Sequence, residues 1–517
     1  ELNGSFAIAF YDRAKRQLGL VSDRLCSRPI YYRETKDRVI FATEFGPVIE
    51  KSEGKLELDL QGVYEFFAFT HLLDDHTYYR SIRTVRPATV LTFDGKGKEE
   101  FSYWQHSYRP AGKSRGNPDE YSERLARTLK KAVNRRISSN ESKTGLFLSG
   151  GLDARVALAA ADKPLTTFTV GDRRNREARL AAEAAELAGV PNIFLERDAD
   201  HYYSLIEEAV ELGGGMHQFS DAHFLGLLGQ VNDRCPVLLN TYGFDARLKG
   251  HFFPPRQIPW PGGKVSLSKT AGAISTEELF QAETWEKVPS SMLYRSPRKL
   301  FTPDHRGRFR LKVMESLSGL LEEADTANPY NLVEFPAVSS FRSLSTYLMV
   351  MSSRAYLPQR SIVLDSDLID LSLSMPPRLR ANGYAIKQAL KKLSPELGRL
   401  KNSDTGIRAD APKWLEFTVL NFRTLCRKYL NIWTGTEEYP TQTQGSWPHW
   451  PELIRRNDSI RGKFRSLVED PGALPPQIFD RDRVKGLFGR HIQREEDNSR
   501  LLISLVTFGL WYRKYGP

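Results

Sequence analysis

The sequence predicts an α/β protein in three parts: a layered β-rich section, a doubly wound parallel sheet and a helical C-terminal part. Short β-type runs fill residues 1 to 105, strand-like and helix-like segments alternate from 144 to 245, and helical patterns dominate after 270. Such alternation is typical of a parallel sheet that binds ligands at the carboxyl ends of its strands. At 517 residues the chain is too long for one core, so two domains with appended helical segments are expected.

The first section is predicted to consist of short strands. Its β-branched and aromatic runs are separated by turn-like or charged residues, and the predicted strands are 5–11, 17–22, 29–34, 38–43 and 88–93. A helix is expected over 59–73, where apolar side chains recur at helical spacing. The stretch 107–118 contains Pro, Gly, Ser, Lys and Arg without periodicity, and we interpret it as a linker.

The second section begins with an amphipathic helix over 119–138 and then alternates. The predicted strands are 145–148, 165–170, 192–195 and 237–239, and the predicted helices are 153–161, 176–188, 201–212 and 222–230. Helices follow after 270 and end in the apolar stretch 501–511. The stretches 252–310 and 430–475 are rich in Pro, Gly and Trp, and we interpret them as long loops.

Composition argues against several classes of protein. No run of about 18 apolar residues occurs and nothing resembles a signal peptide, so no membrane partner is expected. Cys26, Cys235 and Cys426 are far apart and odd in number, which favours neither a disulfide framework nor a zinc site and predicts a cytoplasmic protein. The net charge of +11 comes from dispersed basic residues, and no nucleic-acid partner is expected. The densest cluster, 173–176, could contact phosphates or an acidic substrate, or be a plain surface loop.

The most informative segment lies between Leu146 and Arg155. A buried strand passes through Ser149-Gly150-Gly151 into strong helix formers. A Ser and two Gly residues at such a turn let backbone N–H groups point into one concavity, and the helix N-terminus adds positive potential. The segment therefore predicts a phosphate cradle, with a ligand-free tight turn as the alternative. Asp153 distinguishes it from the Gly-Lys-Ser/Thr phosphate loop.

The pattern Ser-Gly-Gly-x-Asp-Ser resembles the pyrophosphate loop of the ATP pyrophosphatases, which cleave ATP between the α- and β-phosphates to form adenylates. This chain departs once, with Ala154 at the usual Ser, which removes one hydroxyl donor and leaves the backbone cradle intact. Residues 2–12, 22–24, 29–32, 41–44 and 78–104 resemble the second half of the glutaminase domain of asparagine synthetases.

Together the two halves of the chain resemble the asparagine synthetase family over residues 1–410. The resemblance implies a partial, Ntn-hydrolase-type layered β domain at 1–106, a linker at 107–118, an ATP pyrophosphatase domain at 119–410 and a helical C-terminal extension at 411–517. Family members begin with a Cys that is the nucleophile for glutamine hydrolysis, whereas this sequence starts at Glu1, as expected of a partial sequence. Cys26 falls in a predicted turn and is interpreted as structural, so glutamine hydrolysis is not expected from these residues.

The resemblance also implies site residues. The nucleotide contacts are expected from Leu148, Ser149, Gly150, Gly151, Asp153, Val170 and Gly243, where the backbone of Leu148 and Val170 corresponds to adenine contacts. The segment 241–250 resembles a Gly-x-Gly-x-Asp-Glu motif whose Asp binds Mg²⁺, so Asp153 and Asp245 are the expected Mg²⁺ ligands. A helix N-cap is the alternative for Asp245.

Two further residues are candidates for catalysis. Asparagine synthetases usually carry Glu at the position of Tyr242, whereas β-lactam synthetase carries a Tyr that helps to deprotonate the attacking amine. A Tyr needs a neighbouring base for this step. The Glu that would be its partner is expected near Thr346, where the sequence has none. Tyr242 is therefore either a catalytic residue or part of the pocket wall. Lys401 lies in a stretch, 360–406, that follows the family's C-terminal pattern, and corresponds to a Lys that neutralises phosphate charge. A solvated Lys is the alternative.

The expected reaction is ATP- and Mg²⁺-dependent activation of a carboxylate, with aspartate as the leading candidate. The carboxylate attacks the α-phosphate, Mg²⁺ and Lys401 stabilise the departing pyrophosphate, and ammonia or an amine then displaces AMP to give an amide. One alternative is amide formation with a different amine, as in β-lactam synthetase or lasso-peptide cyclases, which Tyr242, Ala246 and Ala154 favour. Another is a degenerate nucleotide-binding protein. The oligomeric state stays open, with a homodimer as one candidate.

Overall fold

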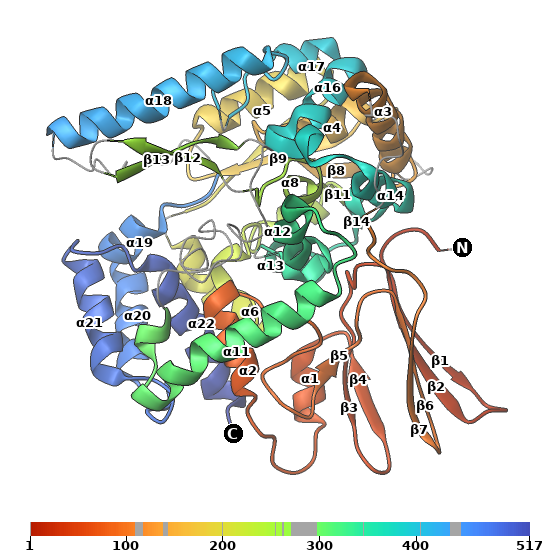
Figure 1. Cartoon of the computed structure of the whole chain (residues 1–517), viewed down its shortest axis with the longest axis vertical. Coiled ribbons are helices and arrows are strands. Elements are labelled where there is room, and N and C mark those ends of the chain that lie inside the picture. Colours follow the sequence, from red (N-terminus) through yellow and green to blue (C-terminus); the bar gives the residue numbers. More distant parts are fainter. Residues whose placement is uncertain are drawn as a thin grey trace.

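The structure, a computed structural model, describes residues 2–108, 117–137, 143–198, 200–253, 255–260, 263–269, 297–344, 346–403, 405–434 and 446–517. Figure 1 shows antiparallel N-terminal sheets at one end of the molecule, a mixed α/β region at the other, and a group of C-terminal helices beside them. The predicted fold class is confirmed, since a parallel sheet, antiparallel sheets and a helical C-terminal part are all present.

The N-terminal region contains two antiparallel sheets, with the strand orders β1-β2-β6-β7 and β4-β3-β5. All five predicted strands form, with ends within two residues of the expected ones. The elements are β1 (Ala7–Asp12), β2 (Gln17–Ser22), β3 (Tyr31–Glu34), β4 (Val39–Ala42), α1 (Phe45–Glu50), α2 (Leu60–Phe69), β5 (Arg83–Thr84), β6 (Thr89–Asp94) and β7 (Gly97–Ser102). Strand β7 was not predicted, because all six of its residues are exposed and it lacks a buried face.

The parallel sheet has the order β10-β9-β8-β11-β14 in the described residues. Its strands are β8 (Thr144–Phe147), β9 (Thr166–Gly171), β10 (Asn192–Glu196), β11 (Val237–Asn240) and β14 (Gln359–Ser361). The chain moves outward from β8 through β9 and β10, then returns to the other side of β8 to form β11. This reversal is a topological switch point, where open α/β sheets form a crevice at the carboxyl ends of the strands. The segments that follow β8 and β11 are therefore neighbours.

Helices connect and surround these strands (Figure 1). Those of the sheet region are α3 (Pro118–Asn134), α4 (Leu152–Ala160), α5 (Arg176–Leu187), α6 (His201–Leu212), α7 (Leu228–Asn232) and α8 (Phe244–Leu248), with the short turn η1 (Phe219–Asp221). Further along are η2 (Pro297–Leu300), α11 (Pro303–Glu322), α12 (Pro329–Val338), η3 (Phe341–Ser343), α13 (Leu348–Arg354), η4 (Ile362–Leu364), α14 (Ser366–Ser374), α15 (Pro377–Arg380), η5 (Ala381–Gly383), α16 (Tyr384–Leu393) and α17 (Pro395–Arg399).

The C-terminal helices are α18 (Lys413–Thr434), α19 (Trp450–Arg456), α20 (Asp458–Glu469), α21 (Arg481–Ile492) and α22 (Ser499–Tyr515). The helix expected over the apolar stretch 501–511 is confirmed as part of α22. Across the part of the chain that the structure describes, no helix is long and apolar enough to cross a membrane.

Two expectations about secondary structure were wrong. The helix predicted over 222–230 forms only from Leu228 onward, because Gly226 adopts a left-handed φ of +81° just before it. The stretches interpreted as long loops contain the hairpin β12 (Pro255–Trp260) and β13 (Gly263–Lys269), the start of α11, and helices α19 and α20. Helices α11 and α19 have Pro in their first turn, where its missing N–H costs nothing, so these prolines mark helix starts and not loops. Residues 270–296 and 435–445 lie outside the described residues.

Candidate functional site

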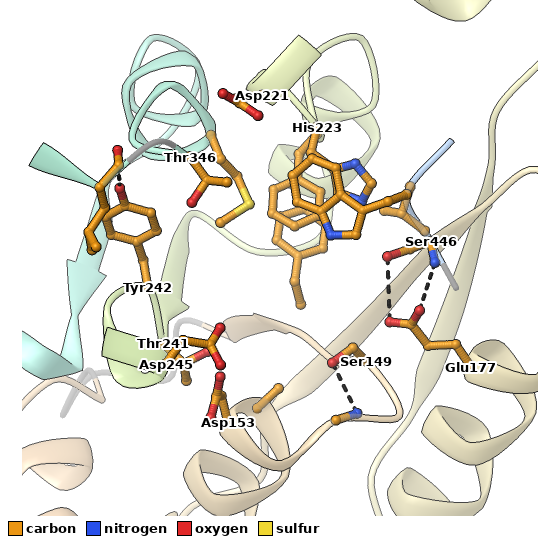
Figure 2. Close-up of a pocket in the computed structure, with 18 of the residues that line it drawn as sticks. Ser149, Asp153, Glu177, Asp221, His223, Thr241, Tyr242, Asp245, Thr346 and Ser446 are labelled. Atoms are coloured by element: carbon orange, nitrogen blue, oxygen red, sulfur yellow. Dashed lines mark hydrogen bonds between the residues drawn. The ribbon is translucent and has the colours of Figure 1, made fainter. Parts of the chain in front are cut away.

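A cavity of about 810 Å³ lies at the carboxyl ends of β8 and β11 (Figure 2). Eight of the predicted site residues line it: Leu148, Ser149, Gly151, Asp153, Val170, Tyr242, Gly243 and Asp245. Two predicted residues, Gly150 and Lys401, are not among the lining residues. The reversal of strand order thus brings the phosphate-loop motif and the segment after β11 to one cavity.

The predicted phosphate loop, Ser149–Gly151, joins β8 to α4, and hydrogen bonds from neighbouring segments fix its backbone. The Gly151 amide donates to the Ser149 hydroxyl oxygen at 3.2 Å. The Gly150 carbonyl accepts from the Ser403 amide at 3.0 Å and from Arg155 Nη2 at 2.8 Å. A Cβ at Gly150 would lie 2.9 Å from Ser403 Cβ, so this close approach requires glycine. Gly150 therefore allows the close packing that fixes the loop, while Ser149 and Gly151 line the cavity.

Arg155 anchors this arrangement, although its sequence context indicated only a helix former. Its side chain is buried, and it donates to the Leu400 carbonyl at 3.1 Å and to the Lys401 carbonyl at 2.7 Å, besides the Gly150 carbonyl. Hydrogen bonds from a charged guanidinium are among the stronger ones in a protein interior. The same contacts fix the backbone of Lys401 behind the loop, while the Lys401 side chain is exposed and lies outside the cavity lining.

The two residues expected to contact adenine, Leu148 and Val170, lie directly after β8 and within β9. The Leu148 amide donates to the Phe168 carbonyl at 2.8 Å, and the Leu148 carbonyl accepts from the Thr169 hydroxyl at 2.8 Å. Val170 is the paired residue of Leu195 in the β9–β10 ladder. Both Leu148 and Val170 line the cavity, and their contact with adenine stays a prediction.

Asp153 and Asp245 lie in the first turns of α4 and α8. Figure 2 shows both carboxylates directed into the same part of the cavity. Gly243, the N-cap of α8, has a left-handed φ of +88°, which lets the chain turn sharply from β11 into the helix. The two predicted metal ligands are therefore brought together by the fold.

Lys249 occupies the place between these carboxylates, and sequence reasoning did not single it out. Its Nζ lies 3.0 Å from Asp153 Oδ2 and forms an ion pair with Asp245 Oδ1. Burial disfavours the charged ammonium, but the Asp153 and Asp245 carboxylates outweigh burial and raise the pKa of Lys249. In the described residues no group of three or more His, Cys, Asp or Glu side chains is placed to hold a metal ion. With Lys249 in this position, a Mg²⁺ ion does not fit between the two carboxylates.

Tyr242 forms part of the wall. Its hydroxyl donates to the Leu344 carbonyl at 3.1 Å, and burial raises the pKa of Tyr242 well above its ordinary value. Thr346, at the place where a Glu partner was sought, lies beside it and also lines the cavity. A phenol that keeps its proton and shares it with a backbone carbonyl is poorly suited to accept a proton from an amine.

The opposite wall comes from α5, the segment after α6 and residues 446–451, none of which was predicted. The Ser446 amide donates to Glu177 Oε2 at 2.6 Å, a contact drawn in Figure 2. Trp447 stacks on His223 with ring centroids 4.0 Å apart. Burial and the neighbouring Arg197 hold the pKa of His223 well below its usual value, so its ring is neutral. The Trp-rich composition of 445–450 was the one signal in the sequence that could have indicated this wall.

Asp221 adds an ionisable group to the same side of the cavity. Burial raises the pKa of Asp221 to about 8, although Arg500 opposes this shift. Arg500 belongs to α22, so the C-terminal helix contributes to the cavity as well. This region offers both a guanidinium and a carboxyl group that can be neutral near pH 7.

The other polar candidates lie elsewhere. Arg173 and Arg174 are exposed, and Arg176 donates to the Ser403 carbonyl at 2.8 Å, so none of the three belongs to the cavity lining. The Cys26 thiol is buried 3.3 Å from the Val85 carbonyl, and burial raises the pKa of Cys26 to about 12. A thiol that stays protonated is a weak nucleophile, in line with the structural role expected for Cys26.

A parallel sheet with a Ser-Gly-Gly phosphate loop after its central strand and a cavity at its switch point defines a PP-loop α/β protein. The family model described as "Asparagine synthase" matches residues 124–396, which is more than half of the chain. The model described as "Glutamine amidotransferase domain" matches residues 1–104. The chain belongs to the asparagine synthase family.

Several curated proteins are similar over part of the chain. Asparagine synthetase [glutamine-hydrolyzing] 3 of Bacillus subtilis (strain 168) is 27% identical over 186 residues, which cover 34% of this chain and 29% of that protein. Asparagine synthetase [glutamine-hydrolyzing] 1 of the same organism is 24% identical and covers 41% of this chain and 33% of that protein. Amidase chry2 of Gibberella zeae is 27% identical over 156 residues, which cover 30% of this chain and 22% of that protein. The matched part thus spans about a third or less of these relatives' length.

Proposed function

We propose that this chain is an ATP-dependent amide-forming ligase, which activates a small-molecule carboxylate as its adenylate and transfers it to ammonia or an amine. The observation that carries the proposal is that the phosphate loop, Asp153 and the segment after β11 line one cavity at the switch point of the sheet. Its volume falls in the range of about 300–1,000 Å³ typical of small-molecule sites. Membership of the asparagine synthase family supports the proposal.

In this proposal the chain binds the β- and γ-phosphates at the Ser149–Gly151 turn, where backbone N–H groups and the N-terminus of α4 favour negative charge. The substrate carboxylate attacks the α-phosphorus, the bond to the pyrophosphate oxygen breaks, and pyrophosphate leaves. The amine nitrogen then attacks the acyl carbon, AMP leaves and the amine loses a proton. Lys249 bridges the two carboxylates predicted to hold Mg²⁺, so no step is assigned to a metal ion.

Aspartate and ammonia are the first substrates to test, because the similar curated proteins are named as asparagine synthetases. A second candidate is amide formation with an amine other than ammonia. It is favoured by Tyr242 and Ala246, which line the cavity at positions where asparagine synthetases are expected to carry carboxylates. In that case Tyr242 forms part of the pocket wall and does not act as a base, because its hydroxyl donates a hydrogen bond to the Leu344 carbonyl.

The test is ATP–pyrophosphate exchange with MgATP and a panel of carboxylates that begins with aspartate. We expect exchange that depends on the carboxylate and falls about 10²-fold or more in Asp153→Ala, because Asp153 positions the Lys249 ammonium beside the predicted phosphate loop. The matched control is Asp162→Ala, which removes an exposed aspartate paired with Lys130 and should leave exchange unchanged. Exchange only with another carboxylate would exclude aspartate, and no exchange with any carboxylate while ATP binds would leave a nucleotide-binding protein without ligase activity.

A further inference from the structure

We propose that the ammonium of Lys249 is the resident cation of the Asp153–Asp245 pair and stands in the place of a divalent metal ion. The inference deepens the proposed function, because it concerns the phosphate end of the same cavity. It starts from a disagreement between the sequence, which predicts a Mg²⁺ site at these two carboxylates, and the structure, which places a lysine between them.

The contacts of Lys249 hold its ammonium from both sides. Nζ is 3.0 Å from Asp153 Oδ2, and only 17% of the Lys249 side chain and 18% of the Asp153 side chain are exposed. Asp245, whose side chain is 57% exposed, precedes Lys249 by four residues, and Lys249 is the C-cap of α8. At this spacing an acidic residue and a following lysine can meet. One partner thus comes from the phosphate loop side of the cavity and the other from the lysine's own helix.

The aliphatic part of Lys249 is held as well. Gly383 has a left-handed φ of +68°, and a Cβ at this position would lie 3.3 Å from Lys249 Cγ and 3.5 Å from Lys249 Cδ. The lysine stem therefore packs closely against Gly383, where a Cβ would make a tight contact with Lys249 Cγ and an ordinary contact with Lys249 Cδ. This packing, together with the two ion pairs, distinguishes Lys249 from a solvated surface lysine.

A metal ion and this ammonium compete for the same oxygens. Mg²⁺ binds carboxylate oxygens at about 2.0–2.1 Å, so an ion shared by Asp153 and Asp245 would lie beside the Lys249 charge. Two positive groups in contact repel, most strongly where solvent is largely excluded. An ammonium has three donors, and two of them meet the carboxylates in the described structure, so the third can meet a phosphate oxygen of a nucleotide.

The decisive experiment titrates the protein with Mn²⁺ alone and follows free Mn²⁺ by electron paramagnetic resonance. Four proteins are compared: the wild type, Lys249→Met, Lys249→Arg and Lys463→Met. Lys463 is the matched control, since 19% of its side chain is exposed and it pairs with Glu207 away from the cavity. We expect Lys249→Met to bind Mn²⁺ about tenfold or more tightly than the other three, because only this variant removes the positive charge that lies between the two carboxylates. The double variant Lys249→Met/Asp153→Asn should lose the gain.

Equal Mn²⁺ affinity of the wild type and Lys249→Met would overturn the inference. If Lys249→Met does not fold, the wild type alone decides: a non-hydrolysable ATP analogue should bind in EDTA within about threefold of its affinity in Mg²⁺, as calorimetry measures. A requirement for Mg²⁺ in that binding would overturn the inference. Failure of the analogue to bind under either condition would overturn the proposed function. The inference is then tested by Mn²⁺ titration of the wild type and Asp153→Asn without nucleotide: tight Mn²⁺ binding by the wild type that Asp153→Asn abolishes would overturn it.

Discussion

Gly150 and Gly151 are neighbours in the phosphate loop but meet different constraints. A Cβ at Gly150 would lie 2.9 Å from Ser403 Cβ and 3.1 Å from Leu180 Cβ, whereas a Cβ at Gly151 would meet Ser149 Oγ at 3.2 Å. The first pair of contacts involves side-chain atoms close to the backbone, which cannot move without shifting the chain. The second involves a single hydroxyl that can rotate away. Gly150 is therefore the position that fixes the loop against α5 and the segment around Ser403.

We expect Gly150→Ala to lower the free energy of unfolding by about 1–3 kcal/mol, because the added methyl group overpacks this contact. Gly151→Ala should cost less than about 1 kcal/mol, because its neighbour can adjust. Chemical denaturation of the two variants beside the wild type measures both values. Equal losses in the two variants would contradict the assignment of separate roles.

At the scale of elements, the edge strand β14 is tied to the end of α3 by buried charges. Arg136 Nε donates to the Ser361 carbonyl at 2.7 Å, and Arg136 Nη1 donates to Asp365 Oδ2 at 2.8 Å. The Asp365 side chain is fully buried. Burial acts to raise the pKa of Asp365, but hydrogen bonds and charge from Arg136 and Arg135 outweigh it and lower this pKa below the usual value.

Asp365→Asn should lower the free energy of unfolding by about 3 kcal/mol, because Arg136 would stay buried without its counter-charge. Asp367→Asn removes an exposed carboxylate from the same turn and should change stability by less than about 0.5 kcal/mol. Because the folded pKa of Asp365 is lowered, its contribution is present above the ordinary Asp pKa of about 3.9 and is lost as the pH falls through the folded value. Denaturation curves at pH 7 and pH 3 test this: the gap between wild type and Asp365→Asn should narrow at the lower pH.

At the scale of the whole molecule, the last helix packs against the first section of the chain. The ring of Trp511 in α22 lies 4.2 Å from that of Tyr78 and is stacked on Phe45 at 6.4 Å. Gly215, with a left-handed φ of +69°, leaves room for it, since a Cβ there would lie 2.4 Å from Trp511 Cβ. One apolar cluster therefore extends from Tyr31 of β3 to α22, farther than expected for a chain of this length, whereas the buried side chains of β2 and β6 form a separate cluster.

Trp511→Ala should lower the free energy of unfolding by about 3–5 kcal/mol, because it leaves a large cavity where distant parts of the chain meet. The matched control is Trp414→Ala, which truncates a tryptophan that is 69% exposed and should change stability by less than about 0.5 kcal/mol. Urea denaturation followed by far-UV circular dichroism measures both. Similar losses in the two variants would show that the contacts of Trp511 do not hold the sections together.

Local physics explains why the sequence predicted much of the fold. The strands and helices from Thr144 to Leu212 follow hydrophobic periodicity and Gly-containing turns, and all of them form. Strand β7 and the three-residue β14 carry no such pattern and exist only because a neighbouring strand supplies hydrogen bonds. The short helix α7 begins later than expected because Gly226 ends the preceding turn in a conformation that depends on its surroundings.

Short motifs and repeating patterns were enough to predict the Ser149–Gly151 turn, the carboxylates Asp153 and Asp245 and the class of sheet, because each of these depends on residues close together in the chain. Which side chains share the cavity depends on how the elements pack together. The tertiary structure brought Lys249 between the two carboxylates, kept the Lys401 side chain outside, and added Trp447 and Arg500 from distant segments. Such contacts join residues far apart in the chain, and they follow from how strands and helices pack, which local patterns do not specify.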